Sequence, residues 1–265
     1  MTPTAAEAKT DAVWRERDTT PAAIEKALRG LLTEARGRSE RYVPARSLNL
    51  VCIVDKDYSG EVANRLRGVG RFAASRTIVC SVSPKQETVD AVATIAVPSE
   101  TESHLHAPMR ETVVLELGPK HLRHLETIID PIVVTDVPTV VWSPHDHPDA
   151  LDALLGLSQV VLVDSVDEPD PADAITRVRS LMDRSYIVDL SWLRTTPWRE
   201  RVAATFDPAP LRGDLRLISN LVLRHHPESA ICGALFVGWM ASRLNWELTP
   251  LSVDSAGTRT GLAHT

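Results

Sequence analysis

Short apolar runs alternate with helix-length segments over the first two thirds of the chain. Residues 60–68 and 119–129 carry apolar positions at the three- and four-residue spacing of an amphipathic helix. Thr19-Thr20-Pro21 supplies an N-cap and a first-turn proline for an earlier helix. The runs that predict strands are 48–54, 77–82, 89–97, 112–117, 139–142 and 160–163. This alternation predicts an α/β fold whose mixed, mostly parallel sheet is covered by helices.

An acidic, proline-containing stretch interrupts this pattern. Residues 164–173 hold five acids and two prolines in ten positions, which is typical of a solvated linker or a helix-starting loop. We place the domain boundary here. The predicted organisation is an N-terminal tail and helix over 1–45, an α/β domain over 46–164, a smaller α/β domain over 165–253 and a polar tail over 254–265.

The second part of the chain begins with a predicted helix over 172–183. A further helix is predicted at Pro197, with Thr196 as its N-cap and Glu200 as a possible capping partner. Alternating leucines predict a strand over 215–223. An apolar helix over 229–244 and a closing strand over 246–253 follow.

Composition narrows the class of protein. The 265 residues are 43% hydrophobic and 24% charged with a formal charge of −6, so the chain can form an ordinary core and lacks the basic character of a general nucleic-acid binder. The longest uncharged run, 229–242, has 14 residues, too few to cross a bilayer. The acidic N-terminus has no apolar block typical of a signal peptide. We therefore expect a soluble cytoplasmic protein without a membrane partner.

The sequence contains no convincing motif for binding a dinucleotide or a metal ion. The residues 68–73 fit G-x-G-x-x-A, but they follow a predicted helix and precede a strand, the inverse of a dinucleotide site, so they are interpreted as a helix end and turn. The histidines pair closely but lack a third and fourth ligand at zinc spacing, so no metal site is expected. These histidine pairs are His121 and His124, His145 and His147, and His225 and His226.

Nucleophilic catalysis finds no support either. There is no G-x-S-x-G sequence and no phosphate-binding Walker loop. Cys52, Cys80 and Cys232 are an odd number without C-x-x-C spacing, which indicates reduced thiols packed in apolar segments, with a redox role as the alternative. No catalytic residue, no cofactor and no enzymatic activity are therefore expected.

Tryptophan and arginine concentrate in one segment. Six of the twelve aromatic residues of the chain are tryptophan. Trp192 and Trp198 lie six apart, among Arg194, Arg199 and Arg201. Trp and Arg are enriched where proteins bind one another, because each combines a large apolar area with a polar group. The segment either stabilises the second domain or contacts a partner.

Five segments of the chain follow one another in a recognisable order. They are SRTIVCSVSP (75–84), VVLEL (113–117), HLETIIDPIVVTDVPTVVWSP (124–144), DLSW with PWR (189–199) and LFVGWMASRLNW (235–246). In this order they resemble the OpcA family of glucose-6-phosphate dehydrogenase assembly proteins, and the resemblance covers about residues 45–250.

The resemblance implies a non-catalytic partner of glucose-6-phosphate dehydrogenase. Such a protein promotes the active oligomeric state of the dehydrogenase or activates it allosterically, and so supports NADPH production by the oxidative pentose phosphate pathway. It also implies that Trp192, Arg194, Trp198 and Arg199 are candidate partner-contact residues, with fold stabilisation as the alternative. The family's redox regulation does not transfer to a particular cysteine of this chain.

Two other functions stay open at this point. The chain could be a sugar-phosphate-binding protein or an enzyme, because an α/β sheet can bind its ligand in a pocket at the carboxyl ends of its strands. Arg and His side chains of the loops, such as His145 and His147, would hold the anion. A scaffold could bind the dehydrogenase without changing its rate. The sequence does not decide self-association.

Overall fold

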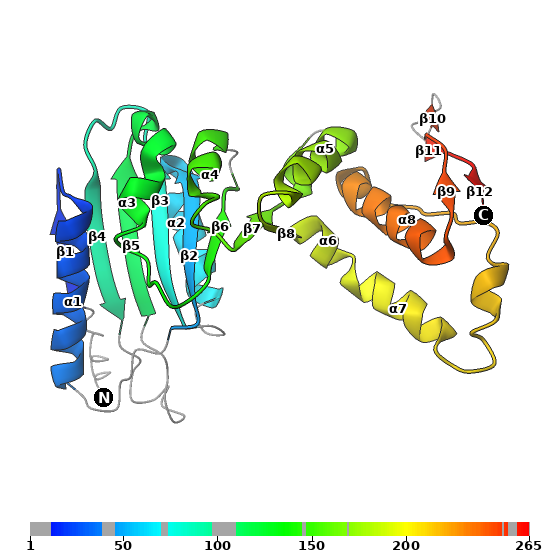
Figure 1. Cartoon of the computed structure of the whole chain (residues 1–265), viewed down its shortest axis with the longest axis horizontal. Coiled ribbons are helices and arrows are strands. Elements are labelled where there is room, and N and C mark those ends of the chain that lie inside the picture. The colour runs from blue at the N-terminus through cyan, green and yellow to red at the C-terminus, as the bar shows by residue number, and fades with distance from the viewer. Residues whose placement is uncertain are drawn as a thin grey trace, which may run out of the picture. The chain divides into compact units, whose positions relative to one another are not determined.

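The computed structural model describes residues 12–38, 46–69, 74–96, 110–144, 147–168, 170–250, 252–253 and 259–264. The chain divides into two compact units (Figure 1). The first comprises Met1–Leu162 with Arg184–Ile187, and the second comprises Val163–Asp183 with Val188–Thr265.

The described residues of the first unit are organised around a sheet of eight strands, in the order β1-β4-β5-β3-β2-β6-β7-β8. Strands β5, β3, β2, β6 and β7 are mutually parallel, while β4 and β1 join antiparallel at one edge. The predicted mixed, mostly parallel sheet is therefore confirmed. The strands are β1 (Ala12–Glu16), β2 (Leu48–Asp55), β3 (Ser75–Val82), β4 (Asp90–Ala96), β5 (Arg110–Leu117), β6 (Thr139–Trp142), β7 (Val160–Val163) and β8 (Tyr186–Asp189). The last of these continues from the first unit into the second.

The central strand β2 is apolar from Leu50 to Val54 because both of its faces are covered. Leu50, Cys52 and Val54 pack against Val62 and Leu66 of α2 (Ser59–Val69). The intervening side chains of β2 face the other side of the sheet and are also buried. Strands β4 and β5 instead alternate between buried and half-buried positions, as expected where only one face is fully covered.

Three predicted helices of the first unit are present, whereas α4 was not predicted. Thr20 caps α1 (Pro21–Arg38), since its hydroxyl accepts the Ala23 N–H at 3.3 Å. The predicted helix over 119–129 divides into the 3₁₀ turn η3 (Pro119–His124) and α3 (Leu125–Ile129). Helix α4 (Pro148–Leu154) follows β6. Strand β1 was not predicted, because two of its five residues are charged and it forms no apolar run like those of the other strands.

A row of buried polar side chains lies at the amino ends of the parallel strands. Asn49, Arg76 and Glu111 occupy matching positions on β2, β3 and β5. The Glu111 carboxylate accepts from Arg76 Nε at 2.8 Å and from Arg46 Nε at 2.6 Å. Arg76 Nη1 also donates to the Ile132 carbonyl at 2.5 Å. This row thereby attaches the segment before β6 to the sheet.

Helices dominate the second unit. Four helices and three 3₁₀ turns are described, and four two-residue strands form the antiparallel pairs β10–β11 and β9–β12. The helices are α5 (Pro171–Met182), α6 (Leu190–Arg194), α7 (Thr196–Phe206) and α8 (Ala230–Leu244). The turns are η4 (Ser165–Asp167), η5 (Asp214–Leu217) and η6 (Pro227–Ser229). The strands are β9 (Glu247–Leu248), β10 (Ser252–Val253), β11 (Arg259–Thr260) and β12 (Ala263–His264). No helix in the described part of the chain has the length and apolar character needed to cross a membrane.

Two predicted strands of the second unit are wrong. Residues 215–223 begin inside η5 and continue as an extended segment that joins no described sheet. The predicted strand over 246–253 contains only the short strands β9 and β10, separated in part by Pro250, which has no N–H for a ladder. Residues 259–264, expected to be a polar tail, contain β11 and β12. The N-cap of α7 is Thr195 rather than Thr196, and Glu200 makes no capping box.

Candidate partner interface

Asp189 ends β8 and anchors the start of α6. Its carboxylate accepts the Ser191 N–H at 2.8 Å, which caps the helix, and the Ser165 hydroxyl at 2.6 Å. Ser165 and Ser191 are buried with it. The DLSW sequence is therefore a strand end and helix cap that attaches α6 to the turn η4.

Asp164 directly follows β7 and binds Arg194 of α6. The two guanidinium nitrogens Nη1 and Nη2 each donate to one carboxylate oxygen at 2.6 Å, and the Ser191 hydroxyl donates to Oδ1 at 2.7 Å. Burial alone would raise the pKa of Asp164, but the hydrogen bonds from Arg194 and Ser191 outweigh it and hold the pKa below its usual value. Asp164 was predicted to belong to a solvated linker or helix-starting loop, but its side chain is only 12% exposed, so a solvated position is wrong for this residue.

Trp192 and Arg199 form a cation–π contact. The guanidinium carbon of Arg199 lies 3.6 Å from the centroid of the Trp192 ring. Arg199 Nε and Nη2 donate to the hydroxyls of Thr195 and Thr196 at 2.9 and 2.8 Å. Helices α6 and α7 are thus joined by a fixed aromatic–arginine pair, whose ring is half-buried.

Trp198 differs from the other three candidates in being 66% exposed. It lies in the first turn of α7, a helix that contains no buried residue. A large aromatic side chain in this position offers apolar area without first breaking an internal contact. Of the four candidate partner-contact residues, Trp198 is therefore the most available to another protein.

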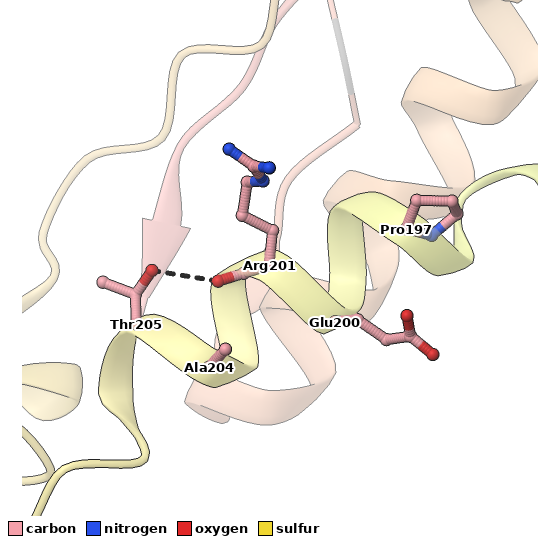
Figure 2. A pocket seen from close by; sticks show the side chains of 5 residues that line it. All are labelled: Pro197, Glu200, Arg201, Ala204 and Thr205. Atoms are coloured by element: carbon pink, nitrogen blue, oxygen red, sulfur yellow. Dashed lines mark hydrogen bonds between the residues drawn. The ribbon is translucent and has the colours of Figure 1, made fainter.

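The surface of α7 also carries a shallow hollow, shown in Figure 2. Pro197, Glu200, Arg201, Ala204 and Thr205 line it, and all five come from this one helix. The Glu200 and Arg201 side chains extend in different directions, and the Thr205 hydroxyl donates to the Arg201 carbonyl at 2.9 Å (Figure 2). Such an open surface fits contact with a protein better than enclosure of a small ligand.

Cys52 and Cys80 are buried core residues. Cys52 pairs with Val79 across β2 and β3, so the Cys52 and Cys80 side chains point to opposite faces of the sheet and cannot reach each other. Burial raises the pKa of Cys52 to about 12 and also raises the pKa of Cys80. Both thiols are protonated near neutral pH and inaccessible to solvent, as the packing interpretation predicts.

Cys232 lies on α8 beside the DLSW segment. Its thiol is half-buried and lies 3.5 Å from the Ser191 carbonyl. Burial raises its pKa, although Arg194 acts in the opposite direction. Cys232 is consequently the most accessible of the three cysteines and still no activated thiolate.

The histidines make separate local contacts. The His121 ring accepts the Gly118 N–H at 3.1 Å, and His225 Nδ1 lies 2.9 Å from the His226 carbonyl. Among the described residues, no group of three or more His, Cys, Asp and Glu side chains is arranged to hold a metal ion. The second half of the G-x-G-x-x-A sequence (70–73) lies outside the described residues, while its first glycine is within α2 and β3 follows it.

The carboxyl edge of the parallel strands is the alternative ligand site. His147 Nε2 lies 3.2 Å from Asp55 Oδ1, and His145 lies outside the described residues. The loop after β2 also carries Asp57, and Lys56 forms an ion pair with Glu116. A phosphate would meet two carboxylates here, so the described residues of this edge suit an anion poorly.

Comparison with known proteins matches both parts of the chain. Residues 68–180 match the model of the glucose-6-phosphate dehydrogenase subunit N-terminal domain, and residues 185–264 match that of the C-terminal domain. The OxPP cycle protein OpcA of Synechococcus elongatus is 28% identical over 151 residues, 56% of this chain and 34% of that protein. Its counterpart from Nostoc punctiforme is 24% identical over 170 residues, 63% of this chain and 37% of that protein. The chain thus spans about a third of the length of these relatives.

Proposed function

The chain belongs to the OpcA family, and from this membership we propose that it binds glucose-6-phosphate dehydrogenase and promotes the active oligomeric state of that enzyme. It would act in the cytoplasm as a non-catalytic effector and so support NADPH production by the oxidative pentose phosphate pathway. The observation that carries the proposal is the match of two successive segments to the two domains of a glucose-6-phosphate dehydrogenase subunit.

The surface of α6 and α7 supports this proposal. Asp164 holds Arg194 of α6, and the stacking of Arg199 on Trp192 joins α7 to α6. The helix backbone that carries the exposed Trp198 is therefore ordered before binding, so ordering it costs little conformational entropy. An exposed tryptophan on an ordered helix is typical of the centre of a protein–protein contact.

An effector of this type acts through differential affinity. If the chain binds the active oligomer better than the inactive form, it shifts the population between them by that difference, typically about 1–3 kcal/mol. The chemistry of hydride transfer would be unchanged. The half-saturation concentration of glucose-6-phosphate, the maximal rate or the oligomer distribution would change.

The experiment is a glucose-6-phosphate saturation curve of the dehydrogenase from the same organism, with and without the chain. Reducing and oxidising conditions are compared, because Cys232 is partly accessible. We expect a lower half-saturation concentration or a higher maximal rate, with a shift in particle mass. Unchanged kinetics and unchanged mass at saturating chain would contradict the proposal. Altered mass with unchanged kinetics would indicate a scaffold.

A substitution locates the contact. Trp198→Ala removes a 66% exposed side chain, so we expect less than about 0.5 kcal/mol change in the free energy of unfolding. Binding to the dehydrogenase, measured by biolayer interferometry, should weaken by about tenfold or more. The matched control is Met182→Ala, which removes a 62% exposed side chain from the end of α5. Equal losses in the two variants would contradict a specific role of Trp198.

A further inference from the structure

Residues 218–225 form an extended segment between η5 and η6. The backbone is extended at both ends of this stretch, with φ −64° and ψ 113° at Ile218, its first residue, and φ −68° and ψ 147° at His226, the residue that follows it. Among the described residues, no backbone hydrogen bond joins 218–225 to another segment. The segment whose leucine pattern predicts a strand thus has extended backbone at its ends and no described neighbouring strand.

Half-buried and exposed side chains alternate over residues 221–224 of this segment. Leu223 and His225 lie against Gly233 of α8, where an added Cβ would come within 3.0 Å of both side chains. Val222, which precedes them, is 74% exposed, and Arg224 between them is exposed as well. Helix α8 therefore packs against the C-terminal part of the segment.

Backbone polar groups of a strand point sideways, between its two faces. The cover from α8 consequently leaves both hydrogen-bonding edges of 218–225 uncovered by any described strand. An extended segment that is already ordered loses little conformational entropy when another strand adds to it. This arrangement is suited to strand addition from another molecule.

Charge distinguishes between the possible occupants. Residues 212–226 contain Arg212, Arg216 and Arg224 against Asp214, so this stretch carries 3 − 1 = +2 in a chain of net charge −6. A second copy of the chain would bring a second basic segment to the same edge. A strand flanked by acidic side chains would instead be attracted to it.

We propose that residues 218–225 pair edge to edge with an exposed, acid-flanked strand of the dehydrogenase. This inference rests on the proposed function and adds the contact that performs it. Leu217 and Val222, 75% and 74% exposed, would be covered by the added strand and its neighbours.

The test is hydrogen exchange of the full chain, alone and bound to the dehydrogenase, read at single residues by mass spectrometry with electron-transfer fragmentation. Successive residues of a strand direct their N–H groups to opposite edges. Pairing at one edge should therefore protect alternate amides, either 220, 222 and 224 or 219, 221 and 223. Binding without protection of 218–225 would overturn this inference and leave the proposed function intact.

Proline variants test each edge. Val222→Pro removes an N–H from one edge and Ser219→Pro from the other, and neither N–H has a backbone partner among the described residues. One of the two should weaken binding by about tenfold or more, while the control Val222→Thr, which changes the side chain but keeps the N–H, should weaken binding clearly less than Val222→Pro. Wild-type affinity in both proline variants would overturn the proposal.

The remaining outcomes distinguish which molecule pairs with residues 218–225. Protection of 218–225 that rises with the concentration of the chain alone would overturn the dehydrogenase as occupant in favour of a second copy. Screening of charges becomes strong over roughly 50 to 500 mM salt. If the affinity for the dehydrogenase stays constant over this range, the proposal that the added strand is flanked by acidic side chains is overturned. Absence of any binding would refute the proposed function and this inference together.

Discussion

Arg194, Arg199 and Trp198 are neighbours in the sequence, but their side chains have different surroundings. Arg194 donates to both carboxylate oxygens of Asp164, and Arg199 stacks on Trp192. These contacts stabilise the fold of the second unit, as the alternative interpretation of the segment proposes. Trp198 has most of its area exposed, and so remains the strongest candidate for contact with a partner.

The buried thiols of Cys52 and Cys80 make the stability of the fold depend on pH. The pKa of Cys52 rises from 9.0 in an exposed thiol to about 12 in the fold, and the pKa of Cys80 rises too. Above pH 9 the unfolded thiols lose protons that the folded ones retain, so stability present below pH 9 is lost as the pH rises toward 12. The double variant Cys52→Ala, Cys80→Ala should lack this loss.

Urea unfolding at pH 8 and pH 10 measures the effect. We expect the free energy of unfolding of the wild type to fall by about 2–3 kcal/mol more than that of the double variant. Lysines and tyrosines titrate in both proteins, so the difference between them isolates the thiols. An equal fall in the two proteins would show that Cys52 and Cys80 are not desolvated.

Among secondary-structure elements, β2, β3 and β5 are connected at their amino ends by the row of buried polar side chains Asn49, Arg76 and Glu111. Apolar packing alone permits a strand to shift along its neighbour. A buried charged side chain does not, because it must stay opposite the oppositely charged side chain of the next strand. Glu111 supplies that charge between Arg76 and Arg46. The row therefore fixes the register of these strands and the position of the segment around Ile132.

Glu111→Ala tests this arrangement. The substitution leaves the buried Arg76 without its carboxylate, so we expect the free energy of unfolding to fall by about 3–5 kcal/mol in guanidinium denaturation. Glu116→Ala is the control on the same strand. Its side chain is one third exposed and pairs with the exposed Lys56, so a fall of less than about 1 kcal/mol is expected. Similar losses at the two positions would refute a special role for the row.

At the scale of the whole molecule, the two units differ in how much apolar side chain they bury. Among the described residues, the largest fully buried side chains all belong to the first unit. They are Ile24, Leu28, Ile53, Ile78, Ile95, Leu115, Leu117, Leu125, Ile129, Ile132 and Leu154. The second unit instead leaves large apolar side chains such as Trp198, Leu217 and Val222 exposed. Its surface is the one expected to be covered when a partner binds.

Hydrogen exchange of the free chain checks this difference. Amides in β2, β3 and β5 should exchange only on global unfolding, while those of α7 and α8 should exchange about tenfold faster or more, through local opening. Helices as protected as the central strands would contradict the prediction. The expected order follows from buried apolar area, which is the main source of local stability.

The sequence by itself determined the alternation of strands and helices in the first unit. Runs such as 48–54 are apolar because both faces of a central parallel strand are covered, and that pattern is local. The sequence also located α1 from its cap and apolar spacing, α8 from its uncharged apolar run, and α5 behind the acidic stretch. The candidate contact residues were found by composition and by the family resemblance.

The tertiary structure alone decided which candidates are available and which predicted strand lacks a neighbour. Asp164 and Arg194 are 30 positions apart, so no local pattern reveals that one holds the other. A strand is completed by hydrogen bonds to another segment, and for 218–225 no described segment provides them. Local patterns report the preference of a segment, whereas pairing and exposure depend on what the rest of the chain places beside it.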